Sequence, residues 1–243
     1  MAIGFSKTFL LRKLHQLTGL VPLTMFYFVH LWTNSAALNG AKIYNTHVQD
    51  IHNFPYLLFI EIFGIFLPLL FHSIYGIIIS AEGKPNVLSY GYGRNWFYLL
   101  QRVTGIYLFV FLLFHILNFR FGLIPGLNLT PVAGNADQAF AIVAGEFRIT
   151  WVVVVYILGV LTTAWHLAYG LFLFAVDWGI VIGEKAQRVV LYGTLGLALF
   201  LSATGVNAVF AFVRPCGLLP QVLCEEAKNP SPNSPAKLQS DGE

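Results

Sequence analysis

Residues 56–80, YLLFIEIFGIFLPLLFHSIYGIIIS, decide the fold of this chain. The stretch is apolar almost throughout, and a transmembrane helix needs about 20 such residues in succession. Two ionisable side chains interrupt it, the carboxyl group of Glu61 and the imidazole of His72. Ionisable groups are costly in hydrocarbon, so those that occur there usually mark a functional site. The stretch therefore predicts a membrane-spanning helix that carries chemistry.

Four other stretches have the same character, near residues 15–37, 96–119, 149–176 and 189–213. The chain is 57% hydrophobic and 10% charged, whereas soluble domains carry about 25% charged residues. We therefore expect an all-α membrane protein, a bundle of five transmembrane helices (I to V) forming one domain over residues 1–215. Residues 216–243 are rich in Pro, Ser and Asn, so we expect a polar, disordered tail there.

The basic residues near the spans are unevenly divided between the two sides of such a bundle. The side of the N-terminus has Lys7, Arg12, Lys13, Lys84, Arg94, Arg102, Lys185 and Arg188, and the other side has Lys42, Arg120, Arg148 and Arg214. The positive-inside rule then predicts a cytoplasmic N-terminus and an outer C-terminus. No basic cluster indicates a nucleic-acid partner. Cys216 and Cys224 would lie outside, where a disulfide can persist, although two unpaired thiols fit the sequence equally well.

Each of helices I to IV carries one histidine in its apolar stretch, namely His30, His72, His115 and His166. Helices I and III run outward and helices II and IV run inward, and every histidine comes late in its helix. His30 and His115 should therefore share an outer level and His72 and His166 an inner one, roughly 10–15 Å apart. Two imidazoles per level predict two haems stacked among the four helices I to IV. A haem with both axial positions filled relays electrons. The alternative is four histidines that hydrogen-bond neighbouring helices.

Two short patterns repeat and support the pairing of helices. Residues 71–76, FHSIYG, resemble residues 165–170, WHLAYG, and residues 17–20, LTGL, resemble residues 103–106, VTGI. In the first pattern a glycine follows the histidine by four positions and lies on the same helical face. We expect that glycine to let a flat macrocycle approach the backbone.

Other polar residues have competing interpretations. Glu61 lies about three turns before His72, so we expect it to face the bundle near the outer haem as a proton acceptor for a quinone. A buried carboxylic acid bonded to a neighbour is an equally good interpretation. Arg102, Trp96 and Arg188 at the inner boundary would bind haem propionates, although anchoring to lipid head groups explains them equally well. His15 at the inner boundary could contact a partner or a propionate, although interfacial histidines are commonplace. His47, Asp50 and His52 in the outer loop could exchange quinol protons with the outside, although solvated loop residues are the default interpretation. Pro68 should bend helix II, and Gly193, Gly196 and Gly205 suit close packing of helix V.

Several blocks resemble the membrane cytochrome b subunit of succinate:quinone oxidoreductase, in the single-polypeptide, five-helix, di-haem type. They are RKLH at 12–15, VHL at 29–31, EIF at 61–63, FLPL at 66–69, RNW at 94–96, QRVTGI at 101–106 and FAFV at 210–213. The resemblance runs from about residue 9 to 214, and it places the haem ligands on His30, His72, His115 and His166. It also implies a flavoprotein subunit and an iron–sulfur subunit at the cytoplasmic face of a bacterial membrane, and a quinone, commonly menaquinone.

The resemblance implies a role in succinate oxidation in the tricarboxylic acid cycle, with the chain as anchor and electron carrier and without catalysis of its own on succinate. Fumarate reduction by quinol would use the same wiring. A di-haem cytochrome b of a hydrogenase or formate dehydrogenase would also pair helix histidines, but it should lack these blocks. A haem-free transporter would use the histidines as a proton relay.

Overall fold

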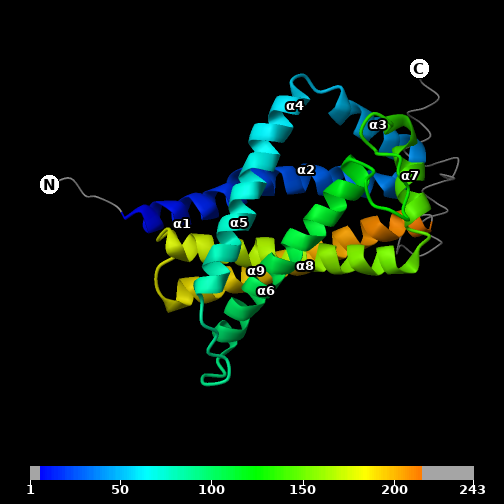
Figure 1. Cartoon of the computed structure of the whole chain (residues 1–243). Coiled ribbons are helices and arrows are strands. Elements are labelled where there is room, and N and C mark those ends of the chain that lie inside the picture. Colours follow the sequence, from blue (N-terminus) through cyan, green and yellow to red (C-terminus); the bar gives the residue numbers. More distant parts are fainter. Residues whose placement is uncertain (1–5, 215–243) are drawn as a thin grey trace, which may run out of the picture.

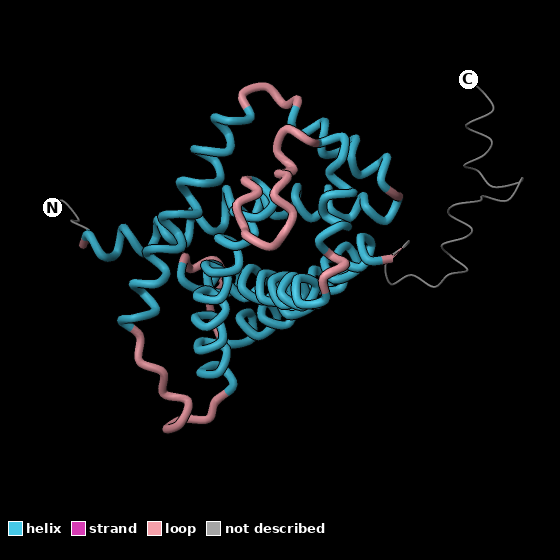
Figure 2. Tube along the Cα trace, turned by 45° about the vertical axis from the view of Figure 1, so that its right-hand side comes forward, coloured by secondary structure: helices cyan, strands magenta, loops and turns pink. Residues whose placement is uncertain are grey.

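The computed structural model describes residues 6–214, where helices joined by loops make up the fold and there is no strand (Figures 1 and 2). The predicted tail at 216–243, with Cys216 and Cys224, lies outside the described residues. The α-helices are α1 Lys7–Thr18, α2 Thr24–Ser35, α3 Ala41–His52, α4 Leu57–Phe59, α5 Leu67–Glu82, α6 Gly93–His115, α7 Ala139–Glu146, α8 Thr150–Asp177 and α9 Glu184–Val213. Three π-helices are η1 Gly19–Leu23, η3 Ile60–Phe66 and η4 Ile116–Arg120, and two 3₁₀-helices are η2 Ala36–Asn39 and η5 Ala136–Gln138.

Four helices in the described part are long and apolar enough to cross a membrane. They are Leu57–Glu82, Gly93–Arg120, Thr150–Asp177 and Glu184–Val213. These are the predicted helices II to V, with boundaries displaced by a few residues. None of the most apolar part of Leu57–Glu82 is buried within the protein. A helix whose apolar side chains are all partly or fully exposed needs hydrocarbon or a partner along its outer face.

The predicted helix I is continuous from Lys7 to Ser35 through α1, η1 and α2, but it is less apolar than the other four. Thr18, Thr24 and Asn34 interrupt its hydrophobic side chains. It begins well before residue 15 because Ser6 caps it, accepting a hydrogen bond from the backbone N–H of Phe9 at 3.2 Å. The fifth crossing of the membrane remains a prediction.

Both prolines in the first two spans lie at π-helical segments. Pro22 lies inside η1, and Pro68 lies in the first turn of α5, directly after η3. A proline cannot donate to the carbonyl group four residues earlier, and its ring crowds that group, so the chain widens into the next hydrogen-bonding register. The disturbance expected from Pro68 therefore takes the form of a π segment.

Polar contacts from α1 join helix I to the C-terminal ends of helices II and IV. Arg12 pairs with Glu82 at 3.0 Å, and Lys13 Nζ donates to the carbonyl oxygen of Asp177 at 2.7 Å. Gln16 Nε2 donates to the Asp177 carboxylate, while Trp178 Nε1 donates to Gln16 Oε1 at 2.9 Å. Exposed pairs of this kind add little stability. They fix which helix ends share one side of the bundle, and we call this side the α1 end.

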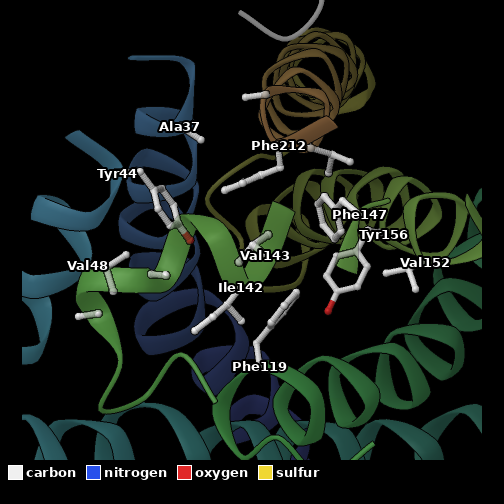
Figure 3. Close-up of a cluster of buried hydrophobic side chains, with 14 of the residues drawn as sticks. Ala37, Tyr44, Val48, Phe119, Ile142, Val143, Phe147, Val152, Tyr156 and Phe212 are labelled. Carbon is white, nitrogen blue, oxygen red and sulfur yellow. The ribbon is translucent and has the colours of Figure 1, made fainter. Parts of the chain in front are cut away.

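The buried core lies at the opposite end, where α3 and α7 pack against α6, α8 and α9. Figure 3 shows Tyr44, Phe147, Tyr156 and Phe212 converging there. The connection between helices I and II, expected to be a loop, forms helix α3 because Tyr44 and Val48 give it an apolar face. His47, Asp50 and His52 therefore belong to this helix.

Glycines allow close packing between three of the long helices, which lie near one another in Figure 1. A Cβ atom on Gly159 of α8 would lie 2.2 Å from the ring of Phe111, and one on Gly205 of α9 would lie 2.5 Å from Val160. Gly193 and Gly196 have nothing within 4 Å of a Cβ position. The expectation of close packing was therefore right for Gly205 and wrong for the other two, which lie on a free face of α9.

Candidate functional site

Four histidine rings meet in two pairs inside the helices. His72 of α5 faces His166 of α8 with ring centroids 6.3 Å apart and planes at 86°. His30 of α2 faces His115 of α6 with centroids 5.6 Å apart and planes at 82°. These are the partners that helical depth predicted. Each pair joins two helices that are not consecutive in the chain, so the bundle itself brings the rings together.

The ring separations suit a metal held between two imidazoles. Each metal–nitrogen bond is about 2 Å long, so with the widths of two rings the centroids must lie roughly 6 Å apart. Within residues 6–214 no group of three or more His, Cys, Asp or Glu side chains is placed to hold a metal ion. Two imidazoles alone are a sufficient protein contribution where a porphyrin supplies the other four ligands.

The hydrogen bond of His72 shows that its Nδ1 carries a hydrogen. Its Nδ1 lies 2.9 Å from the backbone carbonyl oxygen of His15. A carbonyl oxygen can only accept, so Nδ1 must carry the hydrogen, and in the neutral ring Nε2 then has a free lone pair. Metal-binding histidines characteristically donate their second N–H in this way.

Hydroxyl groups hold two of the other rings through the same atom. His166 Nδ1 lies 3.2 Å from the hydroxyl of Thr104, and His115 Nδ1 lies 3.2 Å from the hydroxyl of Tyr156. Gln101 Nε2 also donates to the backbone carbonyl of His166 at 3.0 Å. With His72, three of the four rings have Nδ1 occupied, which leaves Nε2 as the nitrogen available to a metal.

Gly19 and Gly105 form notches for His72 and His166, the two histidines expected at the inner level and called the inner histidines below. A Cβ atom on Gly19 would lie 2.4 Å from Cε1 of His72, and one on Gly105 would lie 3.0 Å from Cε1 of His166. Gly19 and Gly105 are the equivalent residues of the LTGL and VTGI patterns. This repeat therefore lets each inner imidazole approach the backbone of the preceding helix.

The glycines that follow the inner histidines meet other side chains. A Cβ atom on Gly76 would lie 3.0 Å from the ring of His15, and one on Gly170 would lie 3.5 Å from Gln101 Nε2. His15 and Gln101 each lie one turn before the notch glycine of their own helix, so the packing is reciprocal in both halves. These two glycines, expected to face a macrocycle, face polar side chains of the neighbouring helix.

His15 contacts His72 of the inner pair, and the sequence did not predict this contact. Its ring stacks on His72 with centroids 4.1 Å apart and planes at 12°. Its backbone carbonyl accepts the His72 hydrogen bond, and its own Nδ1 is buried without a partner among the described residues. The spacing in the sequence could have indicated this contact. His15 lies one turn before Gly19, and Gln101 lies one turn before the equivalent Gly105.

Glu61 forms an ion pair that the sequence did not predict. Arg120 Nη2 donates to Glu61 Oε2 at 2.8 Å, and the side chains are 35% and 16% exposed respectively. Arg120 is the last residue of η4, which directly follows His115. Glu61 therefore lies beyond the outer pair, and its neighbour is a guanidinium group.

The three residues expected to bind propionates have separate positions. Arg102 donates to the carbonyl oxygen of Ser80 at 3.0 Å, and its guanidinium lies 4.0 Å from the ring centroid of Tyr98. Trp96 is half-exposed, Arg188 is exposed, and neither contacts the four histidines in the described structure. Arg102 thus holds the end of α5, and propionate binding by the three remains a prediction.

The fold and these histidines define a class, the helical membrane proteins whose long helices bring imidazoles together in pairs. No family model matches the chain. The succinate dehydrogenase cytochrome b558 subunit of Bacillus subtilis (strain 168) is 37% identical to it over 208 residues, covering 86% of this chain and 98% of that protein. The chain therefore belongs to the family of succinate dehydrogenase cytochrome b subunits.

Proposed function

We propose that this chain is the membrane anchor and di-haem electron-transfer subunit of a bacterial succinate dehydrogenase, carrying electrons from an iron–sulfur subunit to a quinone. The observation that carries the proposal is the pairing of His72 with His166 and of His30 with His115, at 6.3 and 5.6 Å between ring centroids. Haem iron held by two imidazoles changes valence with no open axial position, so it relays electrons.

The surrounding residues orient the imidazoles of the inner pair. The His15 carbonyl and the Thr104 hydroxyl hold Nδ1 of His72 and His166. Gly19 and Gly105 let both rings lie close to the helix backbones. Ligands fixed in this way need little rearrangement when charge on the iron changes, which favours fast electron transfer.

We assign the α1 end to the cytoplasmic side of the membrane, with helix I as the fifth span. Arg12, Lys13 and Arg94 lie at that end, as the positive-inside rule requires. The flavoprotein and iron–sulfur subunits would bind there and oxidise succinate. Electrons would then enter at the pair nearer this end, His72 with His166, and leave at His30 with His115.

Two levels of haem suit a low-potential acceptor such as menaquinone. An electron that crosses the membrane exchanges about 2.3 kcal/mol per 100 mV with the membrane potential. A quinone site on the outer side would let this energy drive an otherwise unfavourable reduction. The same chain of residues would serve quinol oxidation by fumarate, so the direction depends on the potentials of the partners.

The haem content of the purified complex tests the proposal. We expect about two low-spin b-type haems per copy of this chain, with no binding of carbon monoxide, because both axial positions are filled. Pyridine haemochrome analysis gives the stoichiometry, and reduced-minus-oxidised spectra give the spin state. A single haem, or a component that binds carbon monoxide, would rule out two bis-histidine sites.

We place the quinone reaction near Glu61 and Arg120, beyond the outer histidine pair. Reduction of a quinone to a quinol takes up two protons with two electrons. Glu61 is partly accessible and hydrogen-bonded to Arg120, so it can pass protons, and the guanidinium can bond a quinone oxygen. Asp50 on α3 is exposed and offers a route from the outer side.

Glu61→Gln should keep both haems and succinate oxidation by soluble dyes, but lower quinone reduction by about tenfold or more, the ordinary effect of losing an acid–base group. The matched control is Glu82→Gln. Glu82 lies on the same span and also pairs with an arginine, Arg12, but at the opposite end. Quinone turnover that falls equally in both variants, or in neither, would contradict a role of Glu61 in proton transfer.

A further inference from the structure

A buried carboxyl group lies at the end of a hydrogen-bonded chain that begins at His115. His115 Nδ1 contacts the Tyr156 hydroxyl at 3.2 Å, and Tyr156 is hydrogen-bonded to the side chain of Asn118. Asn118 Nδ2 then donates to Glu146 Oε2. These residues come from α6, α8, η4 and α7, so the chain links the outer histidine pair to the cap formed by α7.

Glu146 and Asn118 are among the most buried side chains of the protein, at 2% and 1% exposure. Phe119 and Phe147 pack around Tyr156, which keeps this region apolar (Figure 3). A carboxylate in such a place is costly unless it is fully hydrogen-bonded. The bonds from the Asn118 amide and the Asn128 backbone do not meet that need, because Glu146 Oε1 has no partner among the described residues.

Two acceptor atoms in the chain lack a donor. Glu146 Oε1 and Asn118 Oδ1 are buried and have no hydrogen-bond partner among the described residues. A buried acceptor that has no donor destabilises the folded protein. One more proton, on the carboxyl group, would supply a donor, so the structure has room for a proton at Glu146.

We infer that Glu146 is a proton-holding residue coupled through Asn118 and Tyr156 to His115, and that it sets the pH dependence of the outer haem. The inference rests on the proposed function, since it needs a haem at His115. Glu146 is a positioning residue here, because it acts on His115 through two intervening side chains. This assigns a role to a residue that the electron path itself does not use.

The proton balance is simple. When one electron reaches the outer pair, negative charge is added near His115, and Glu146 takes up one proton from water on the outer side. An O–H bond of a hydronium ion breaks, leaving water, and the O–H bond of the carboxylic acid forms. Raising the pH removes that proton and makes reduction harder, so the midpoint potential of the outer haem falls as the pH rises.

The groups around Glu146 leave it as the titrating residue of this cluster. Burial raises the pKa of its carboxyl above the ordinary 4.5, while the Asn118 amide and the Asn128 backbone oppose the rise. Tyr156 faces it from α8. On the surrounding elements, Arg120 is held by Glu61, Tyr44 packs on Phe212, and Asp137 and Arg148 are exposed.

Redox titration of the purified complex between about pH 5 and pH 9 tests the coupling. In the wild type the outer midpoint potential should fall with rising pH, by at most about 59 mV for each tenfold change in proton concentration. Glu146→Gln keeps the shape and one hydrogen bond but cannot titrate, so its outer potential should be independent of pH. The inner haem serves as an internal reference.

Two further variants complete the test. Tyr156→Phe retains the carboxyl group but breaks the link, so it should also lose the pH dependence. Asp137→Asn removes an exposed acid nearby and should keep it. If the outer midpoint potential of Glu146→Gln still changes with pH as in the wild type, the inference is overturned. If Glu146→Gln loses its outer haem, the same result in Tyr156→Phe overturns it. A wild type without haem overturns the proposed function itself, whereas two haems with a flat outer potential overturn only the coupling.

Discussion

His166→Ala should remove the inner haem from the complex and leave the outer one. We expect roughly half of the haem to be lost, with one component missing from the redox titration, because a macrocycle without one axial imidazole loses its low-spin coordination. His72→Ala should remove the same component, since His72 and His166 face each other at 6.3 Å. His30→Ala and His115→Ala should both remove the other one.

The control for these variants is His47→Ala. His47 lies on α3, outside the four candidate spans, so this variant should keep both components. Loss of the same component from the His30 and His72 variants would contradict the two levels. Retention of both haems in any of the four variants would contradict ligation by that residue.

The positions of the long helices followed from sequence alone because membrane spans are set by length and apolarity. Helices II to V appear within a few residues of their predicted limits. The positions of the π segments do not follow from the sequence in the same way. Pro22 and Pro68 accompany η1 and η3, but η4 contains no proline. Helix α3 was not predicted because only two of its residues, Tyr44 and Val48, are buried and form an apolar face.

The histidine pairs were predictable because depth along a straight helix is simple arithmetic, and rings at one depth in adjacent helices must meet. Their surroundings depend on helix rotation, which sequence position alone does not give. Arg120 next to Glu61 and Tyr156 next to His115 are contacts between different helices of this kind. Glu146 had one visible signal, a single acid within the apolar residues 139–147.

The notch at Gly19 leads to the second large effect, Gly19→Ala. The new Cβ would lie 2.4 Å from Cε1 and 2.8 Å from Nδ1 of His72, closer than atoms pack. The ring cannot move away freely, because Nδ1 is held by the His15 carbonyl at 2.9 Å and His15 stacks on its face. We therefore expect loss or strong weakening of the inner haem, with the outer one retained.

The Cβ distances at Gly19, Gly105 and a third glycine, Gly64, predict an order of effects that a general loss of stability would not produce. Gly105→Ala approaches His166 at 3.0 Å and should shift the inner midpoint potential with less loss of haem. Gly64→Ala is the matched control, because Gly64 also lies in a π segment but its nearest neighbour is Ile60 at 3.7 Å. Alanine favours helix over glycine by up to about 1 kcal/mol, so this control should be at least as stable as the wild type.

Haem content measured for the three variants should rise in the order Gly19→Ala, Gly105→Ala, Gly64→Ala. An inner haem unaffected by Gly19→Ala would show that His72 does not depend on the notch for its place.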